Sequence, residues 1–486
     1  RSCVMEDEMR NAPSHNFKAY LPQIYATLVI CFVYMSVGVG VVYSAVLVPQ
    51  LKDGVHALHV TDTEQLWIVN CISLVIPLLS VLTGLVTDKC GRLCVLKLTV
   101  VPHVVGWVTI ALAKTSAIVM VGRVITGLSI AFQMGPCFVY ISEISTPKIR
   151  GALLAMPVVF FGIGSLLTNL NGYLASWRMV AWFSCSYGVV ANSLLYTLPN
   201  SPSWLVSRNH IDEAKKSLTW LNKYLTNDPI QLEQLVEHEV SKMGNEQEHN
   251  KATNTLQMVC LPIVYKPLII LTMVLLFQQF SGVNVLLMNT VIFFDKIGTK
   301  LDPYLASNYL AIVRLGMTVL SVWLMKKYGR RPLLMISFFG MAVSMGISGL
   351  YTKWIADGVT EYLQVPLYML VIYTISTTCV MSIPFSLCGE IFPLRVRGIA
   401  SNTALGLLFV FSFASVSSYQ GMLTALGGLH NLQYFYSVMA SAGVAFTFLF
   451  VPETLNKRLS EIEPFFWTHT LAITKQQKTP TSSMSV

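Results

Sequence analysis

Twelve long apolar runs, six before a polar stretch and six after it, constrain this 486-residue chain more than any other feature. A helix needs roughly 20 mostly apolar residues to cross a bilayer. Lipid offers no partners for backbone N–H and C=O groups, so runs of this length must form helices. We therefore predict an all-α membrane protein with twelve transmembrane helices in two six-helix halves. The runs lie near 21–46, 65–87, 93–113, 116–141, 152–175 and 179–198, and near 267–291, 304–325, 333–352, 365–388, 399–422 and 432–451.

The composition supports a membrane protein and argues against other classes. Charged residues make up 12% of the chain, whereas soluble proteins carry roughly 25%. The formal net charge of +9 comes from short basic clusters between apolar runs, so we predict a lipid bilayer as partner and no nucleic acid. The sequence has no nucleophile–base constellation, metal-ligand cluster or phosphate-binding loop, so we expect no enzyme, no metal and no cofactor.

Basic residues predict how the chain is oriented. Lysines and arginines concentrate in the connections after spans 2, 4, 8 and 10, and this side is expected to face the cytoplasm. Both termini and the polar stretch would then be cytoplasmic, in a monomeric, multi-pass protein of the plasma membrane. The expected domains are an N-terminal tail (1–20), a first half (21–198), a helical linker (199–266), a second half (267–451) and a C-terminal tail (452–486).

Three signatures occur once in each half, in the same order. "GLVTDKCGRL" (84–93) is repeated as "VWLMKKYGRRPL" (322–333), and "SEISTPKIRG" (142–151) as "GEIFPLRVRG" (389–398). The third pair is "LPNSPSWL" (198–205) and "VPETLNKRL" (451–459). Parallel repeats of six spans imply alternating access around a central site.

The repeated loops hold charged residues that we expect to form a cytoplasmic gate. Glu143 and Arg150 are seven residues apart, as are Glu390 and Arg397. Carboxylates and guanidinium groups at the cytoplasmic ends of neighbouring helices can pair and hold the cytoplasmic face shut. Alternatively, the arginines only anchor the loops to lipid headgroups. The predicted gate residues are Asp88, Gly91, Arg92, Glu143 and Arg150 in the first half, and Gly329, Arg330, Arg331, Glu390 and Arg397 in the second.

These motifs resemble those of the sugar porter family of the major facilitator superfamily. The resemblance covers residues 20–460 or so. Within the family, the general pattern of the sequence is similar to that of the insect facilitated trehalose transporter-like proteins. It rests on the repeated loops and on Gly122-Arg123 with Gly127, Gln278-Gln279-x-Ser281-Gly282-x-Asn284 and Pro452-Glu453-Thr454. It implies a major facilitator fold and a passive or proton-coupled carrier for sugars, without covalent chemistry.

The seventh run contains amides that lipid cannot satisfy, in "FQQFSGVNVLLMN" (277–289). Amides both donate and accept hydrogen bonds, as a sugar hydroxyl requires. The resemblance implies that Gln278, Gln279 and Asn284 contact the substrate, and Gly282 can loosen the helix beside them. Alternatively, the amides join helices within the bundle. Gln278 and Gln279 point about 100° apart on a helix, so one neighbouring helix cannot serve both.

Other positions depart from the family pattern, and three of them complete the predicted substrate site. Met288 and Asn289 stand where the family has two tyrosines, and Phe385 stands where it has a tryptophan. Arg314 stands about where the family has a neutral amide. We include Asn289, Arg314 and Phe385 in the site. Arg314 could donate to backbone carbonyls, contact an anionic or strongly polar substrate, or reach an outer carboxylate such as Asp295.

The first span, "ATLVICFVYMSVGVGVVYSAVLV", contains no acidic residue. A proton-coupled carrier usually needs an acid within the membrane, so we expect facilitated diffusion of a sugar or related polar solute. Two alternatives stay open. One is a non-transporting nutrient sensor on the same scaffold, and the other is a carrier of a non-sugar solute such as an anion.

Overall fold

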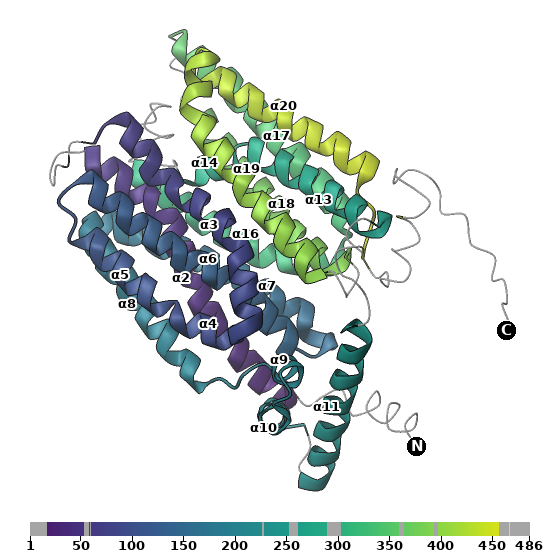
Figure 1. The fold of residues 1–486 in the computed structure, drawn as a ribbon. Helices are drawn as coiled ribbons and strands as arrows, with labels where there is room; N and C mark the ends of the chain where they lie inside the picture. The colour runs from purple at the N-terminus through teal and green to yellow at the C-terminus, as the bar shows by residue number, and fades with distance from the viewer. Residues whose placement is uncertain are drawn as a thin grey trace, which may run out of the picture. The chain divides into compact units, whose positions relative to one another are not determined.

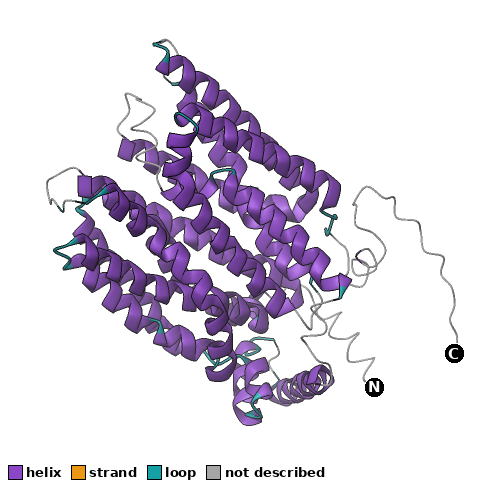
Figure 2. Ribbon diagram, turned by 45° about the horizontal axis from the view of Figure 1, so that its top comes forward, coloured by secondary structure: helices purple, strands orange, loops and turns teal. Residues whose placement is uncertain are grey.

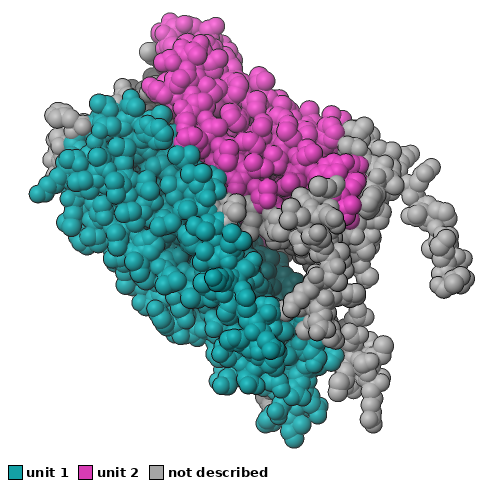
Figure 3. All heavy atoms as spheres, in the orientation of Figure 1, with its two compact units in different colours: residues 1–253 teal, residues 254–486 magenta. Residues whose placement is uncertain are grey.

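A computed structural model describes residues 17–52, 58, 60–225, 228–251, 261–288, 303–358, 364–392, 397–455 and 466. All secondary structure in these ranges is helical (Figures 1 and 2). The chain divides into two compact units, residues 1–253 and 254–486, which Figure 3 shows in different colours. We describe each unit by itself.

Unit 1 contains the first six predicted spans and the linker helices. Helix α2 packs against α6, α7 and α8, while α5 packs against α6 and α8. The predicted third span is two helices, α4 and α5, which meet at Thr99. The helices are α2 (Leu21–Lys52), α3 (Asp62–Cys90), α4 (Arg92–Leu98), α5 (Val100–Ala111), α6 (Ser116–Ile144), α7 (Pro147–Leu174), α8 (Trp177–Leu194), α9 (Pro202–Ser207), α10 (Ile211–Leu221) and α11 (Pro229–Lys251), with short 3-10 helices η1 (Phe17–Tyr20) and η2 (Leu195–Thr197).

Unit 2 contains the last six predicted spans. Helix α17 packs against α18 and α20, α13 packs against α19 and α20, and α16 packs against α18. The predicted seventh span is interrupted and forms two helices, α13 and α14. The helices are α13 (Pro262–Phe280), α14 (Val283–Met288), α16 (Pro303–Lys327), α17 (Arg330–Ala356), α18 (Val365–Glu390), α19 (Arg397–Ala425) and α20 (Leu429–Phe450).

Within the described ranges, ten helices are long and apolar enough to cross a membrane. The count becomes eleven if α3, which bends by 55°, is one span. Of the twelve predicted spans, α8 is the one that falls short of this standard: its 18 residues are long enough, but polar residues such as Arg178 and Asn192 make it less apolar. A helix lies at each of the twelve predicted positions, so the architecture of two sets of six spans is confirmed.

A buried polar network connects the helices of unit 1 where α4 meets α5. Ser36 on α2 donates to Gln133 Oε1 on α6 at 2.9 Å. The Gln133 amide nitrogen donates to Ser129 Oγ at 3.1 Å and to Thr99 Oγ1 at 3.3 Å. Such amide and hydroxyl bonds hold helices together where no hydrophobic force acts between them.

The three linker helices pack around a small apolar core of their own. Its buried members come from α9, α10 and α11, which explains why apolar residues recur at helical spacing in an otherwise polar stretch. On α10, Leu218 and Leu221 are buried, whereas Leu225 lies after the end of this helix and is exposed. The core residues are Leu205, Val206, Ala214, Leu218, Val236 and Val240.

Candidate substrate site and gate

The interruption of the seventh span centres on Gly282. Helix α13 ends at Phe280 and α14 begins at Val283. Gly282 has φ +93°, a left-handed conformation that side chains rarely adopt. A Cβ at this position would also lie 2.7 Å from the Tyr436 ring. The expectation that Gly282 loosens the helix is confirmed, and Tyr436 gives a second reason for glycine.

Hydrogen bonds from neighbouring helices hold the backbone of this break. Tyr373 on α18 donates its hydroxyl to the Ser281 carbonyl at 2.8 Å. Ser415 on α19 donates to the Gln279 carbonyl, also at 2.8 Å. A carbonyl that loses its helical partner is costly in a membrane unless another donor replaces it. These two hydroxyls therefore stabilise the irregular backbone.

Two of the predicted amides bond to each other across the break. Asn284 Nδ2 lies 2.8 Å from Gln279 Oε1 and 2.8 Å from Ser412 Oγ on α19. Gln278 is as buried as Gln279, but its amide oxygen has no hydrogen-bond partner in the described part of the chain. That one neighbouring helix does not serve both glutamines stays a prediction. An amide oxygen of this kind can accept from a hydroxyl.

Arg314 lies half-buried on α16, near Tyr373 on α18. Tyr373 bonds to Ser281, so it links Arg314 to the break. Within the described ranges no carbonyl or carboxylate accepts a hydrogen bond from the Arg314 guanidinium, which weighs against the first of the three alternatives. Asp295 and Asn289 lie outside the described residues. Phe385 lies half-buried on α18.

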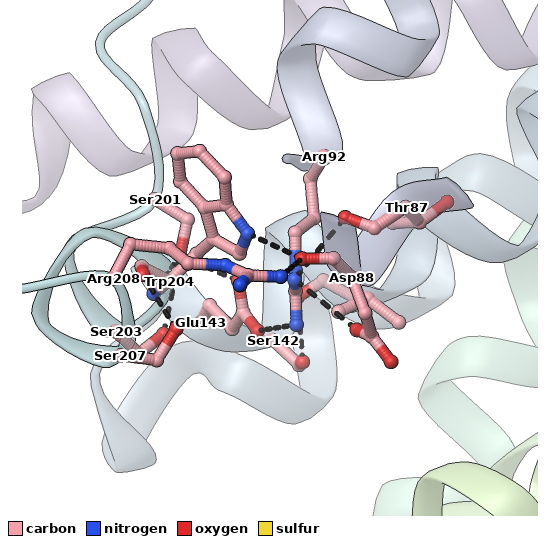
Figure 4. A network of polar contacts seen from close by, with 11 residues as sticks. Thr87, Asp88, Arg92, Ser142, Glu143, Ser201, Ser203, Trp204, Ser207 and Arg208 are labelled. Carbon is pink, nitrogen blue, oxygen red and sulfur yellow. Dashed lines mark hydrogen bonds and ion pairs between the residues drawn. The ribbon is translucent and has the colours of Figure 1, made fainter. Parts of the chain in front are cut away.

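The predicted gate of unit 1 is built around Arg92, at the turn between α3 and α4. Its guanidinium lies 3.0 Å from Glu143 on α6 and 3.3 Å from Asp88 on α3 (Figure 4). The side chains of Arg92 and Glu143 are 13% and 17% exposed, whereas Asp88 is 75% exposed. The pair with Glu143 is therefore the better shielded from solvent.

The expected pairing of Glu143 with Arg150 is wrong. Arg150 instead donates to the Ser145 carbonyl at 3.0 Å. The physical reason is the turn that separates the two residues: α6 ends at Ile144 and α7 begins at Pro147. Two residues seven apart in the sequence do not have to meet across such a turn. Arg92 reaches Glu143 instead, because α4 packs directly against α6.

The linker contacts this cluster of predicted gate residues, which the sequence did not predict. Ser201 accepts from the Trp204 amide at the start of α9 and donates to the Glu143 carboxylate at 2.5 Å. Trp204 Nε1 and Arg208 donate to the Asp88 carbonyl at 2.9 and 2.8 Å (Figure 4). The Ser-Pro pair at the start of α9 is a helix N-terminal signal, but its contact with Glu143 has no signal in the sequence.

Gly91 lies at the centre of this cluster. Its φ is +93°, and a Cβ would lie 3.1 Å from the Trp204 ring. Any other residue here would strain the turn and push against α9, so Gly91 is required both by the backbone and by the linker.

In unit 2, two of the predicted gate residues contact a carboxylate that was not among the predicted gate residues. Glu453, just after α20, accepts from the Arg330 amide at 2.9 Å and the Arg331 amide at 3.2 Å. A carboxylate is stabilised at the N-terminus of a helix, here α17, by its free N–H groups. A Cβ at Gly329 would lie 2.0 Å from this carboxylate. The side chains of Glu390 and Arg397 lie outside the described part of the structure.

Arg123 is a functional candidate that the sequence did not single out for its charge. It is fully buried on α6 and donates to the Gly40 carbonyl at 2.7 Å, the Ile68 carbonyl at 3.4 Å, and Ser44 Oγ. It therefore joins α6 to α2 and α3. A charged side chain in an apolar run is costly unless it has partners or a function, and Arg123 has partners on both neighbouring helices.

The family is decided by comparison with known sequences. The profile of the sugar (and other) transporter family matches residues 20–466, which is most of the chain. The chain belongs to this family. The transporter is therefore a multi-pass membrane protein that carries a sugar or a related solute, and it is not an enzyme.

Relatives and solved structures agree with this assignment. The transporter is similar to the facilitated trehalose transporter Tret1 of Apis mellifera ligustica, at 28% identity over 92% of this chain and 88% of that protein. It is 29% identical to Tret1 of Polypedilum vanderplanki, over 91% of this chain and 87% of that protein. Its fold matches the major facilitator proton:xylose symporter XylE bound to 6-bromo-6-deoxy-D-glucose, with TM-score 0.75, 23% identity, and coverage of 92% of this chain and 100% of that one.

Proposed function

We propose that the transporter carries a sugar by facilitated diffusion, using alternating access between its two halves. The relatives named as facilitated trehalose transporters support a sugar as substrate. So does the break at Gly282, where Gln278, Gln279 and Asn284 offer both donors and acceptors beside an interrupted helix. Interrupted helices are where transporters place their substrates.

The environment of Arg123 is the observation that carries the passive mechanism. Its hydrogen bonds go to two backbone carbonyls and to the Ser44 hydroxyl. The Cys71 thiol and the Tyr43 ring also lie beside it, and neither group ordinarily titrates near neutral pH. None of these acceptors can take up and release a proton near neutral pH, as a carboxylate could. A proton-coupled carrier needs such a group within its spans, so the surroundings of this buried cation favour transport down a gradient.

The proposed topology places the transporter in the plasma membrane, with both termini and the α9–α11 linker in the cytoplasm. Basic clusters after spans 2, 4, 8 and 10 support this orientation. On this side the Arg92–Glu143 pair and the Glu453 cap would hold each half's loops in place, and we propose that both take part in gating.

Arg314 favours a second candidate, an anionic or strongly polar solute. A half-buried guanidinium with no carboxylate partner among the described residues could bind a substrate anion. A non-transporting sensor is the remaining alternative, motivated by Met288 and Phe385 at positions where the family has aromatic gate residues.

Uptake into liposomes that contain the purified protein tests the proposal. Labelled glucose, trehalose and a panel of organic anions are offered with and without a pH gradient. We expect saturable sugar uptake that the gradient leaves unchanged. Uptake of anions alone would favour the second candidate, and binding without any uptake would favour the sensor.

A further inference from the structure

A band of aromatic rings runs along one end of unit 1, where the first and sixth spans meet the linker. The Tyr25 ring, near the start of α2, lies 6.3 Å from the Trp220 ring on α10. The Tyr25 hydroxyl lies 2.9 Å from Thr197 Oγ1 in η2, directly after Tyr196. These contacts join α10 to α2 and to the end of the sixth span, and Figure 1 shows α10 beside the first turns of α2.

Lysines lie against the Tyr196 ring of this band and, just after α10, against the Tyr224 ring. Lys97 on α4 has its Nζ 4.8 Å from the Tyr196 ring centroid, and Lys223 has its Nζ 5.6 Å from the Tyr224 centroid. Lys216 is exposed and stands four residues before Trp220, on the same side of α10. We call Lys97, Lys216, Lys223, Tyr25, Tyr196, Trp220 and Tyr224 the aromatic–lysine rim.

The internal contacts of the linker leave this side of α10 uncovered. The apolar side of α10 is buried in the linker core through Ala214 and Leu218. Lys215 pairs with Glu237 on α11 at 2.7 Å, so it is held within the linker. Lys216, the next residue, forms no ion pair with any described carboxylate, including Asp212 one turn earlier. Among the described residues, none of the rim lysines Lys97, Lys216 and Lys223 is held in an ion pair.

The exposure of the rings shows that the rim is a surface. Tyr196 is 71% exposed, Tyr224 47% and Tyr25 42%. Tyrosine and tryptophan with one apolar side and one polar end favour the headgroup level of a bilayer. Lysines at that level attract anionic lipid, each contributing about 1 kcal/mol. Rings at the ends of two spans, flanked by lysines, fit this chemistry better than they fit a solvated helix face.

We propose that the aromatic–lysine rim binds the headgroup of an anionic phospholipid. The lysines contact the phosphate and acidic headgroup, and the rings lie between headgroup and acyl chains. The bound lipid would connect α10 to α2 and α4. Since α9 of the same linker bonds to Glu143 and Asp88, the lipid would also stabilise the gate of unit 1.

The test compares the full-length protein in nanodiscs of phosphatidylcholine with nanodiscs that also contain phosphatidylserine. The variant is Lys216→Gln/Lys223→Gln. The control is Lys114→Gln/Lys353→Gln, which removes the same charge from exposed positions elsewhere. We expect phosphatidylserine to raise the melting temperature of the wild type and the control, and its apparent affinity for the variant to fall about 30-fold.

A second measurement locates the lipid at the rim. Brominated phosphatidylserine should quench tryptophan fluorescence less in Trp220→Phe than in the wild type, because Trp220 lies within the rim. The proposal is overturned if the variant and the wild type respond equally to phosphatidylserine, or if the control loses as much. It is also overturned if soluble phosphoserine gives the same stabilisation. Sugar uptake in neutral liposomes does not depend on this result, so failure here leaves the transport proposal separately testable.

Discussion

The Arg92 guanidinium and the Glu143 carboxylate lie 3.0 Å apart, between the first turn of α4 and the last turn of α6. Ser201 at the start of α9 donates to the same carboxylate. One carboxylate thus joins two membrane helices to the linker. Any motion that separates α4 from α6 must break this pair. The free energy of the pair therefore biases the balance between a conformation in which α4 and α6 are joined and one in which they are apart.

Replacing Glu143 with Gln should lower the melting temperature more than replacing Asp88 with Asn. Both acids pair with Arg92, but the Glu143 side chain is 17% exposed and Asp88 is 75% exposed. An exposed pair contributes about 0–1 kcal/mol, whereas removing one partner of a buried pair costs about 3–5 kcal/mol. We expect an intermediate cost for Glu143→Gln, measured by thermal unfolding in detergent. Equal shifts for both variants would contradict the ranking.

Replacing Gly282 with Ala should destabilise unit 2. A left-handed conformation costs a non-glycine residue about 1–2 kcal/mol, and the new Cβ would lie 2.7 Å from the Tyr436 ring. We expect the melting temperature to fall by about 5 °C or more. Gly316→Ala on α16 is the matched control, because no atom lies within 4 Å of its Cβ. A control that falls as far as Gly282→Ala would show that the break is not the cause.

Asn284→Ala should reduce the efficiency of sugar uptake far more than it reduces stability. An unsatisfied polar partner costs about 1–3 kcal/mol, so we expect uptake to fall about tenfold to a hundredfold if Asn284 contacts the sugar. Ser412→Ala removes one partner of Asn284 but leaves its amide in place. Uptake kinetics and melting temperature are measured for both. If the two variants lose uptake in proportion to stability, Asn284 only joins helices.

Arg314→Gln distinguishes the two substrate classes. If the arginine binds an anionic solute, the variant should lose uptake of that anion, because glutamine cannot replace its charge. If the arginine restrains a conventional sugar site, sugar uptake should rise instead. Uptake of labelled sugars and organic anions by the same liposome preparations decides between them. An unchanged profile for both classes would remove Arg314 from the substrate site.

Ser44→Asp should make transport sensitive to protons. The new carboxylate would lie beside the buried Arg123 guanidinium, where Ser44 now accepts a hydrogen bond. A buried acid that gains or loses its proton changes the charge balance of this cluster. We expect a pH gradient to alter uptake by Ser44→Asp but not by the wild type or by the neutral control Ser44→Asn. A wild type that concentrates sugar along a proton gradient would contradict facilitated diffusion.

Much of the fold could be predicted from the sequence because a bilayer allows few alternatives. Unpaired backbone groups are so costly in lipid that an apolar run of sufficient length has to be a helix. The break at Gly282 was also visible, since glycine beside buried amides is unusual in a span. The split of the third span at Thr99 was not predicted, although Pro102 marks it: a proline inside a helix removes the hydrogen bond to the carbonyl four residues earlier, here that of Leu98 at the end of α4.

The partners of the charged residues could not be predicted in the same way. The sequence alone determined the twelve spans, their repeat, the amide cluster and the level at which the charges lie, because hydropathy and local geometry act within one segment. Only the tertiary structure decided that Glu143 pairs with Arg92 rather than Arg150, and that Glu453 caps α17. Ion pairs and hydrogen bonds act over about 3 Å, so they depend on which helices pack side by side, and spacing along the chain does not encode that distance.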